Sequence, residues 1–490
     1  MPQSTPPLSS QPTLDSLIFA DLGPRTVVAD FSGGLLSSDG GVLLLRQIDE
    51  GLGLSRELAT CFCDHRNPRF IEHSVRELLS QRLLGLAAGY EDLNDHNLLR
   101  LDPLFAAAVG KADPLGLKRR AERDHGKALA GASTLNRLEL GNTESKGPHN
   151  KIQADHEKIE ATLLRMGVRC LPKHTREVVL DLDATDDPLH GHQEGRFYHG
   201  FYNNYCYLPL LAFVGSIPLW AQLRTSDGGA ARGAVAAMEK IVAAIRQRCP
   251  KARIILRADS GFCNDELMTW CESQSEVYFC LGLARNSRLL EQEKVEAAFA
   301  RVRERAILTG GVSRDFTEFT YQTLNSWSRS RRVIAKAEVL HDKENPRFIV
   351  TNLPVAGFDE GGEAADRFCP QQCYEGFYCA RGDMENQIKQ QYLDLDADRT
   401  STHWMASNQL RLWLSSFALL IMERLRTLAL HGTELARATA GTIRTRFLKI
   451  AAQVSVSTRR VYVRFASAFP LQAIFARAQR ELARLALAEA

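Results

Sequence analysis

The sequence lacks the signatures of several large enzyme classes. It contains no Gly-x4-Gly-Lys-Ser/Thr phosphate loop and no His-Glu-x2-His pair, so ATP hydrolysis and zinc-protease chemistry have no support. No serine stands in the Gly-x-Ser-x-Gly context that exposes a nucleophile, and acyl transfer is therefore unsupported as well. Any catalytic activity of the protein must therefore depend on other side chains, chiefly carboxylates and basic residues.

The sequence also lacks the signatures of a disulfide framework and of a membrane span. The 11 cysteines are odd in number and scattered, which is typical of a protein in a reducing cytoplasm rather than of a disulfide framework. The longest strongly apolar helical run, residues 412–422, falls short of the ~18 residues that a membrane span needs. Residues 1–15 are rich in Pro and Ser without a signal-peptide pattern. We therefore expect a cytoplasmic protein with no membrane partner.

The charge balance is informative only in its distribution. The net charge of +3 says little about partners, but from Arg424 to the end there are 12 Lys+Arg against 3 Asp+Glu. A basic tail of this kind suits a polyanion such as DNA. A solvated helical face is the alternative interpretation.

Changes in residue pattern divide the chain into six segments, since 490 residues are too many for one core. They are a disordered lead-in (1–15), a helical DNA-binding region (16–175), a first core part (176–284), a β-rich insertion (285–375), a second core part with a long polar helix (376–430) and a basic helical region (431–490). Both terminal regions are expected to be all-α. The first core part reads as three successive strands, then helix, strand, helix and strand, which predicts a mixed α/β sheet flanked by helices. This order is similar to that of the ribonuclease H-like fold.

Two aspartates are distinguished by their positions at strand ends. Asp183 ends the apolar run 178–183 and Asp259 ends the run 252–259. Such a carboxylate can reach solvent and a metal ion while its strand stays buried. Asp181 shares a strand face with Asp183, so Asp181 can be the ligand instead, or both can contribute. Taken singly, each is more typical of a turn-capping residue, and it is their combination that favours a metal site.

A third acid lies on a helix with an unusual polar face. Positions separated by three and four residues fall on one helical face, and here they carry Tyr378, Arg381, Glu385, Lys389 and Tyr392. Glu385 could bind a metal ion, Arg381 and Lys389 could contact phosphate oxygens, and Tyr378 could bind the DNA backbone. The alternative is an exposed helix stabilised by pairs such as Glu385–Lys389.

Two strand-end aspartates and a helical glutamate can together hold two divalent metal ions. Such a pair of ions can drive in-line displacement at a phosphodiester. This is the chemistry of cutting and joining DNA.

These residues resemble the motifs of a known family. Asp183-Ala-Thr, Asp259-Ser-Gly and Tyr378-x2-Arg381-x3-Glu385 are similar to the DDE transposases of bacterial insertion sequences, in the branch with a Tyr-Arg-Glu-Lys signature and a β-rich insertion before the Glu. Longer strings resemble one subfamily of that branch, and they begin at Ser37, Gly89, Arg100 and Asp181. The family lysine is expected seven residues after the Glu, where this chain has Tyr392. Lys389, on the same face, is the expected substitute.

The resemblance implies cofactors, partners and a mechanism. Two Mg²⁺ ions, for which Mn²⁺ can substitute, would be held by Asp183, Asp259 and Glu385. The protein would bind terminal inverted repeats, cleave at the element ends and transfer the 3′-OH to target DNA. Relatives assemble on paired ends, so we expect a homodimer, associated with the nucleoid in a bacterial cytoplasm. In some relatives an aromatic residue of the insertion stacks on a flipped base, a role open to Trp327; a packed core Trp is the alternative.

Two other functions are compatible with the same fold. One is a DNA nuclease that cleaves without strand transfer, and the other is a non-catalytic DNA-binding relative. The three intact acids argue against the second. Inverted repeats flanking the reading frame would distinguish a transposase from a nuclease.

Overall fold

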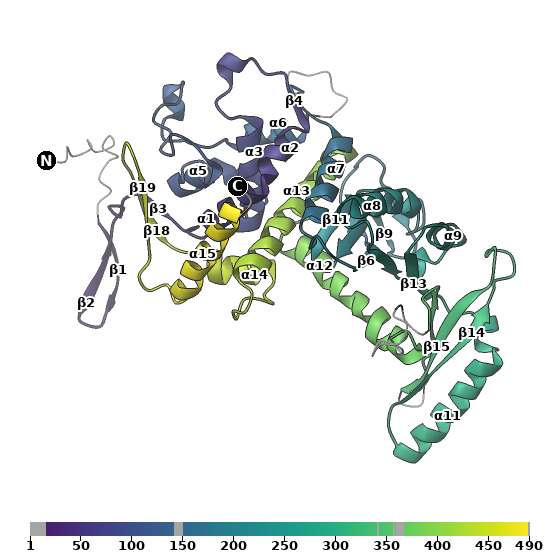
Figure 1. The fold of residues 1–490 in the computed structure, drawn as a ribbon. Coiled ribbons are helices and arrows are strands. Elements are labelled where there is room, and N and C mark those ends of the chain that lie inside the picture. Colours follow the sequence, from purple (N-terminus) through teal and green to yellow (C-terminus); the bar gives the residue numbers. More distant parts are fainter. Residues whose placement is uncertain (1–15, 142–149, 341–342, 356–357, 359–366, 489–490) are drawn as a thin grey trace.

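The computed structural model describes residues 16–141, 150–340, 343–355, 358 and 367–488; the expected disordered lead-in, residues 1–15, lies outside the described residues. Figure 1 shows two bodies side by side, one of them helical and containing both ends of the chain, the other built on a large sheet. Helix α13 (Met405–Arg424) runs between the two bodies.

Nine strands form the central sheet, in the order β11-β10-β6-β12-β13-β17-β15-β14 with β16 paired to β15. Their bounds are β6 (Glu177–Ala184), β10 (Leu210–Val214), β11 (Ile217–Gln222), β12 (Arg253–Ala258), β13 (Val277–Leu283), β14 (Ser313–Tyr321), β15 (Arg331–Leu340), β16 (Lys343–Glu344) and β17 (Arg347–Thr351). Strands β6, β12 and β13 are parallel, and the remaining pairs of the sheet are antiparallel. The sequence predicted the strands β6, β11, β12 and β13.

Alternation along β6 separates its apolar side chains from its acids. Val178, Leu180 and Leu182 are buried in one core with helices α8 (Ala234–Arg248), α9 (Asp265–Ser273) and α11 (Glu293–Thr309). The opposite face of the sheet packs on α12 (Gly382–Leu393) and α13. Because successive residues of a strand point to opposite faces, the aspartates at 181 and 183 point toward α12.

The segment 285–375 was expected to be a β-rich insertion, and the structure shows helices in it as well as strands. It contains β14 to β17, but also the short helix α10 (Ser287–Leu290) and the 17-residue helix α11. Val295, Phe299 and Val302 recur at helical spacing in α11 and are buried, which is why this stretch is helical. Strand β17 pairs with β13, so the segment extends the central sheet. A smaller sheet of β7 (Asp187–Pro188), β8 (Phe197–His199) and β9 (Asn204–Tyr207) lies after β6.

The terminal regions are mainly helical but not all-α, contrary to the prediction. Their helices are α1 (Val42–Leu52), α2 (Leu54–Ala59), α3 (Val75–Ala88), α4 (His96–Leu99), α5 (Pro103–Val109), α6 (Ala132–Glu139), α7 (His156–Arg169), α14 (Ala440–Ile443) and α15 (Gln472–Ala488). Their strands are β1 (Leu17–Leu22), β2 (Arg25–Ala29), β3 (Leu36–Ser37), β4 (Phe62–Asp64), β5 (Ile152–Ala154), β18 (Ala452–Val456) and β19 (Val461–Phe465). A left-handed Gly23 (φ 60°) before Pro24 turns β1 into β2, and alternating valines build β18 and β19.

Helix α13 joins the two ends of the chain to the sheet. It is buried on all sides and belongs to one hydrophobic core with α1, α3, α12 and α14. Among the described residues, no helix combines the length and apolar character that crossing a bilayer requires.

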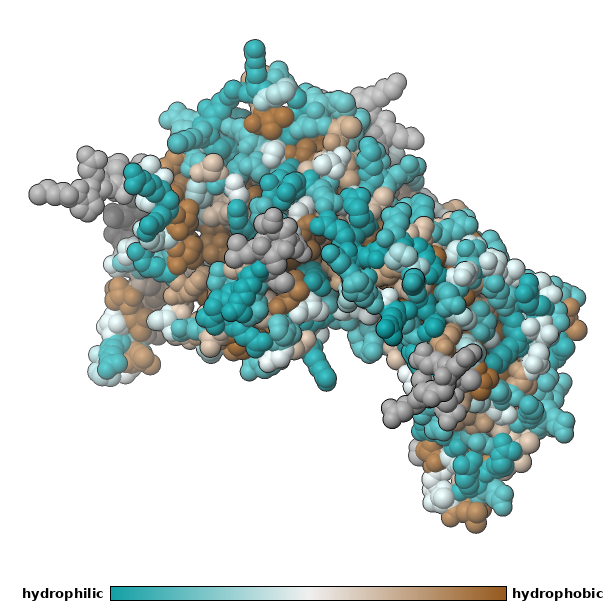
Figure 2. Space-filling model, viewed as in Figure 1, coloured by the Kyte–Doolittle hydropathy of each residue, from teal (hydrophilic) through white to brown (hydrophobic). Residues whose placement is uncertain are grey.

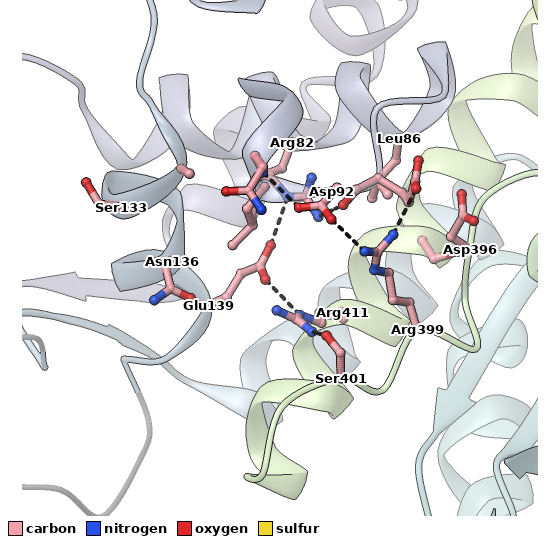
Figure 3. Close-up of a pocket in the computed structure, with 15 residues that line it drawn as sticks. Arg82, Leu86, Asp92, Ser133, Asn136, Glu139, Asp396, Arg399, Ser401 and Arg411 are labelled. Atoms are coloured by element: carbon pink, nitrogen blue, oxygen red, sulfur yellow. Dashed lines mark hydrogen bonds and ion pairs between the residues drawn. The ribbon is translucent and has the colours of Figure 1, made fainter. Parts of the chain in front are cut away.

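A buried group of charges also connects α13 to the N-terminal helices (Figure 3). The fully buried Glu139 carboxylate accepts hydrogen bonds from Arg82 and Arg411, each at 2.8 Å. Burial raises the pKa of Glu139, but the two guanidinium groups bring it below its usual value. Nearby, Arg399 pairs with Glu91 and Asp92 at the wall of a cavity of about 350 Å³.

We expect the Glu139 pairs to contribute to stability because their loss leaves two arginines without their acid. Glu139→Ala should lower the free energy of unfolding by about 3–5 kcal/mol, measured by urea denaturation. Glu50 is the matched control, because it pairs with Arg46 and Arg76 while 41% exposed. Glu50→Ala should cost less than about 1 kcal/mol. Equal losses for the two variants would contradict this role of the buried group.

Candidate active site

The site forms where two neighbouring parallel strands end. In the register of β6 with β12, Asp181 lies opposite Arg257. Asp183 and Asp259 each follow two residues later, so both reach the same edge of the sheet. Neither Asp183 nor Asp259 is fully buried. The two strand-end aspartates singled out from the sequence are therefore neighbours in the structure.

Asp181 has a partner of its own within the sheet. The Arg257 Nε and Nη2 atoms donate to its two carboxylate oxygens at 2.5 and 2.8 Å, and both side chains are almost fully buried. Arg257 Nη1 also donates to the Phe377 carbonyl at 2.6 Å. This two-pronged ion pair ties β6 and β12 to the segment that precedes α12. Both carboxylate oxygens of Asp181 are thereby used.

The helix with the polar stripe lies over this end of the sheet. It begins with a π-helical segment, Gln372–Tyr378, and one tight turn, Cys379–Arg381, before α12 itself. π-Helical turns often occur at functional sites. Arg381 lies between two acids, with Nη2 at 2.8 Å from Glu385 Oε1 and Nη1 at 3.6 Å from Asp183 Oδ2. Glu385 from the helix and Asp183 from the sheet thus share one cation.

Asp259 and Tyr378 meet at a glycine. A Cβ atom on Gly282 of β13 would lie 2.6 Å from the Tyr378 hydroxyl and 2.8 Å from the backbone nitrogen of Ser260. Only glycine lets this tyrosine approach the loop that follows Asp259 so closely. Burial raises the pKa of Tyr378 to about 12, with Arg381 opposing this and Asp259 adding to it. The Asp259 Oδ1 atom accepts from the Gly261 backbone N–H at 2.9 Å.

The acids influence one another electrostatically. Burial raises the pKa of Asp183 to about 6; the guanidinium of Arg381 opposes this, and the carboxylates of Asp259 and Glu385 raise it further. Arg381 in turn is affected by Asp183, Glu385 and Asp259 together. The structure therefore gathers Asp183, Asp259, Glu385 and Arg381 into one electrostatic unit.

The chemistry of this donor set suits a divalent cation. Carboxylate oxygens are the ligands that Mg²⁺ and Mn²⁺ prefer. Burial is the main cause that raises the pKa of Asp183, and a cation would offset the further contribution from Asp259 and Glu385. In the present side-chain arrangement, the part of the chain that the structure describes holds no three His, Cys, Asp or Glu side chains grouped as metal ligands. The Arg381 guanidinium stands between Asp183 and Glu385.

Two other residues singled out from the sequence have different surroundings. Lys389 is exposed and lines a groove with Asp383, Arg426 and Arg437, whereas Arg381 contacts the acids. Trp327 is only 6% exposed. Its ring packs edge-on against that of Tyr321. The burial of Trp327 matches a packed core residue rather than one that stacks on a base.

The sequence did not reveal two features beside the acids. Arg257 was one basic residue in an apolar run, and nothing local named Asp181 as its partner. A cavity of about 450 Å³ also opens next to the site, where the described lining includes Ser260, Arg285, Arg347 and Tyr378. Arg285 follows the end of β13, and Arg347 begins β17. The sequence pattern did not predict that these two arginines lie close together.

The family of the chain follows from a comparison with known proteins. A family model described as "Transposase DDE domain group 1" matches residues 19–487. The chain therefore belongs to the DDE transposase family, whose members are metal-dependent DNA transposases. No curated protein matches the sequence. Among solved structures, a piggyBac transposase synaptic complex with hairpin DNA covers 84% of this chain and 79% of that chain, at 10% identity and a TM-score of 0.39. No functional conclusion follows from a structural likeness at this level.

The two aspartates of β6 should respond differently to removal. Asp181→Ala leaves Arg257 buried without its acid and should lower the free energy of unfolding by about 3–5 kcal/mol. Asp183→Ala removes a buried carboxylate that faces two like charges. This variant should change the free energy of unfolding by less than about 1 kcal/mol, or raise it. Urea denaturation without divalent cations measures both. An Asp181→Ala variant as stable as Asp183→Ala would contradict the structural role of the Asp181–Arg257 pair.

Proposed function

We propose that this protein is the transposase of an insertion sequence, which binds terminal inverted repeats, cleaves at the element ends and transfers the 3′-OH to target DNA. Membership of the DDE family supports the reaction class. The single observation that carries the assignment of the site is the convergence of Asp183, Asp259 and Glu385 around Arg381.

Three carboxylates would hold the metal ions in this proposal. Asp183, Asp259 and Glu385 would be the ligands of two Mg²⁺ ions, with Mn²⁺ as a substitute. When bound, the ions supply Lewis-acid activation of the attacking oxygen and offset charge on the reacting phosphodiester. Glu385 is the adaptable member, because its side chain is 46% exposed whereas that of Asp183 is 14% exposed.

The basic residues near the acids have roles that depend on their positions. Arg381 balances the Asp183 and Glu385 charges in the free protein, and its two contacts leave guanidinium donors for a phosphate oxygen. The Tyr378 hydroxyl lies next to the loop after Asp259 and would donate to the DNA backbone. Lys389 would bind DNA further along, in the groove that it shares with Arg426 and Arg437.

A ribonuclease H-like core is the fold that we propose for the catalytic part. Its first five strands lie in the order β11-β10-β6-β12-β13, with β10 antiparallel to both neighbours and β6, β12 and β13 parallel. This arrangement supports the proposal, since it brings the ends of β6 and β12 together beneath α12.

DNA and a second copy of the chain are the proposed partners. The basic C-terminal region and the arginines beside the acids suit a polyanion. Joining two element ends to one target requires two active sites, and a homodimer in a paired-end complex supplies them. We place this complex on the bacterial nucleoid, in the cytoplasm.

Cleavage of a terminal-repeat duplex by the purified protein with Mg²⁺ or Mn²⁺ tests the proposed function. Asp259→Ala should lower the cleavage rate by a factor of roughly 10²–10³ or more while duplex binding persists, because charge stabilisers at a reaction centre are worth about that much. Glu304→Ala is the matched control, since Glu304 is exposed on α11, which lines neither the site nor the groove of Lys389. Glu304→Ala should cleave at nearly the wild-type rate.

Two outcomes of this assay would overturn the proposal. Normal cleavage by Asp259→Ala would refute the assignment of the site. Cleavage by the wild type without joining of the 3′-OH to a supplied target plasmid would favour a nuclease of the same fold.

Divalent cations should stabilise the folded protein through the same three acids. A ligand that binds only the folded state at about 100 times its Kd adds roughly 2.7 kcal/mol. Mg²⁺ or Mn²⁺ should therefore raise the Tm of the wild type in a thermal-shift assay, and Glu385→Gln should remove most of the increase. Asp383→Asn should keep it. An equal increase in the wild type and in Glu385→Gln would mean that the cation binds elsewhere.

A further inference from the structure

The first described residues form a projecting arm, defined here as residues 17–31. Its hairpin, β1 and β2, extends from the helical body at the side away from the central sheet (Figure 1). Every residue of both strands is exposed. No residue of the arm belongs to a hydrophobic core of the described chain.

The arm is nevertheless rich in large apolar side chains, with exposed fractions between 39% and 78%: Leu17, Ile18, Phe19, Leu22, Val27, Val28 and Phe31. Both faces of the hairpin are apolar, since Ile18 pairs across from Val28 and Phe19 from Val27. Figure 2 shows this projection as a cluster of hydrophobic residues at the lower left. A two-stranded hairpin alone is at best marginally stable in water, and an exposed apolar patch of this kind marks an interaction site.

The charges of the arm favour a protein over DNA as the occupant. Residues 17–31 carry Asp21 and Asp30 against Arg25 alone. Surfaces that bind the DNA backbone are basic, because they must neutralise phosphates. An apolar arm with a slight negative charge fits an apolar protein surface with positive charge.

A surface of that description lies beside the arm on the same chain. Strand β3 follows the arm, exposes Leu36 (61%) and pairs with β18. The ribbon, defined here as β18 and β19 with their turn (residues 452–465), carries three arginines and no acid, which leaves the other nine Lys and Arg residues from Arg424 onward for DNA. It exposes Val461 (41%) and Tyr462 (43%). The exposed apolar surface therefore continues from the arm to a basic ribbon.

The exposed area is that of a dimer interface. At roughly 150–200 Å² for a fully exposed large apolar side chain, the fractions for the arm and Leu36 amount to on the order of 800 Å² per chain. A stable interface of standard size takes about 800 Å² from each partner. One arm and one ribbon on each chain also make a self-complementary pair of surfaces, as a two-fold dimer requires.

We propose that the arm binds a second copy of this chain, and that in the resulting two-fold dimer the apolar, acidic arm of each copy covers the apolar, basic ribbon of the other. This dimer rests on the proposed function, because a paired-end complex needs two copies of the chain. The arm and the ribbon are the surfaces that hold them together. The contacts would form on the side of the helical body away from the central sheet, leaving the acid site free for DNA.

The mass of the full-length protein in solution tests this dimer, without DNA or divalent cations. We expect light scattering after size exclusion to give two chains for the wild type and one 54.6 kDa chain for the double variant Ile18→Glu/Val28→Glu. The dissociation constant of the dimer should rise at least about 100-fold in that variant, as expected when two central apolar contacts are each lost. Val461→Glu, on the ribbon, should weaken the dimer in the same direction.

A matched control separates this interface from general surface polarity. Ile307 of α11 is 82% exposed, comparable to Ile18 at 75%, and α11 lies at the opposite end of the molecule. Ile307→Glu should remain a dimer. All variants should keep the circular dichroism of folded protein, because these side chains contribute nothing to a core.

Three results would overturn the arm-mediated dimer: a single-chain wild type at every concentration, a double variant that stays dimeric, or a ribbon variant that stays as tight as the wild type. Hydrogen exchange adds a second measurement, since amides of residues 17–29 should gain protection as protein concentration rises. A dimer that forms as described in a protein that never cleaves DNA would leave this inference standing and refute the proposed function alone.

Discussion

The buried ion pair between Asp181 and Arg257 is the interaction on which the candidate site depends. It joins two neighbouring parallel strands and, through the Phe377 carbonyl, the segment that leads into α12. Since Asp183 and Asp259 follow these two residues at the same distance along their strands, the pair fixes both acids at one level. Burying two charges is costly, and here the two-pronged geometry and the third hydrogen bond offset that cost. In return, the ion pair holds the sheet and the helix of Glu385 in one relative arrangement.

The acids that this anchor brings together are poorly matched to one another. Burial raises the pKa of Asp183 to about 6 and two neighbouring carboxylates add to the shift, whereas the Arg381 guanidinium and the Ala184 backbone N–H oppose it. A site that disfavours its own charges is a common property of catalytic centres, where stability is lost locally for function. The same carboxylates become favourable when a cation or a phosphate with its counterions arrives. The Asp181–Arg257 ion pair thus stabilises the fold, whereas the three acids of the site are available to bind ligands.

Much of the site could be predicted because its signals are local. Asp183 and Asp259 end apolar runs, and the spacing of Tyr378, Arg381 and Glu385 marks one helical face. The rest depends on distant partners: nothing near Arg257 identified Asp181, and the local pattern around Trp327 left both base stacking and core packing open, of which the structure shows core packing. Lys389 shares the α-helical face of Glu385, as its spacing of four residues predicts, but the groove that it lines with Arg426 and Arg437 could not be read from the local pattern. The C-terminal region was predicted to be all-helical, but alternating valines build the strands of the ribbon.

Anomalous diffraction from crystals containing Mn²⁺ tests the central claim most directly, because it locates the ions without reference to activity. The account predicts manganese peaks within ligand distance, about 2.0–2.3 Å, of carboxylate oxygens of Asp183, Asp259 and Glu385, with Arg381 turned out from between them. Peaks confined to other parts of the chain, with Arg381 still bridging Asp183 and Glu385, would contradict it.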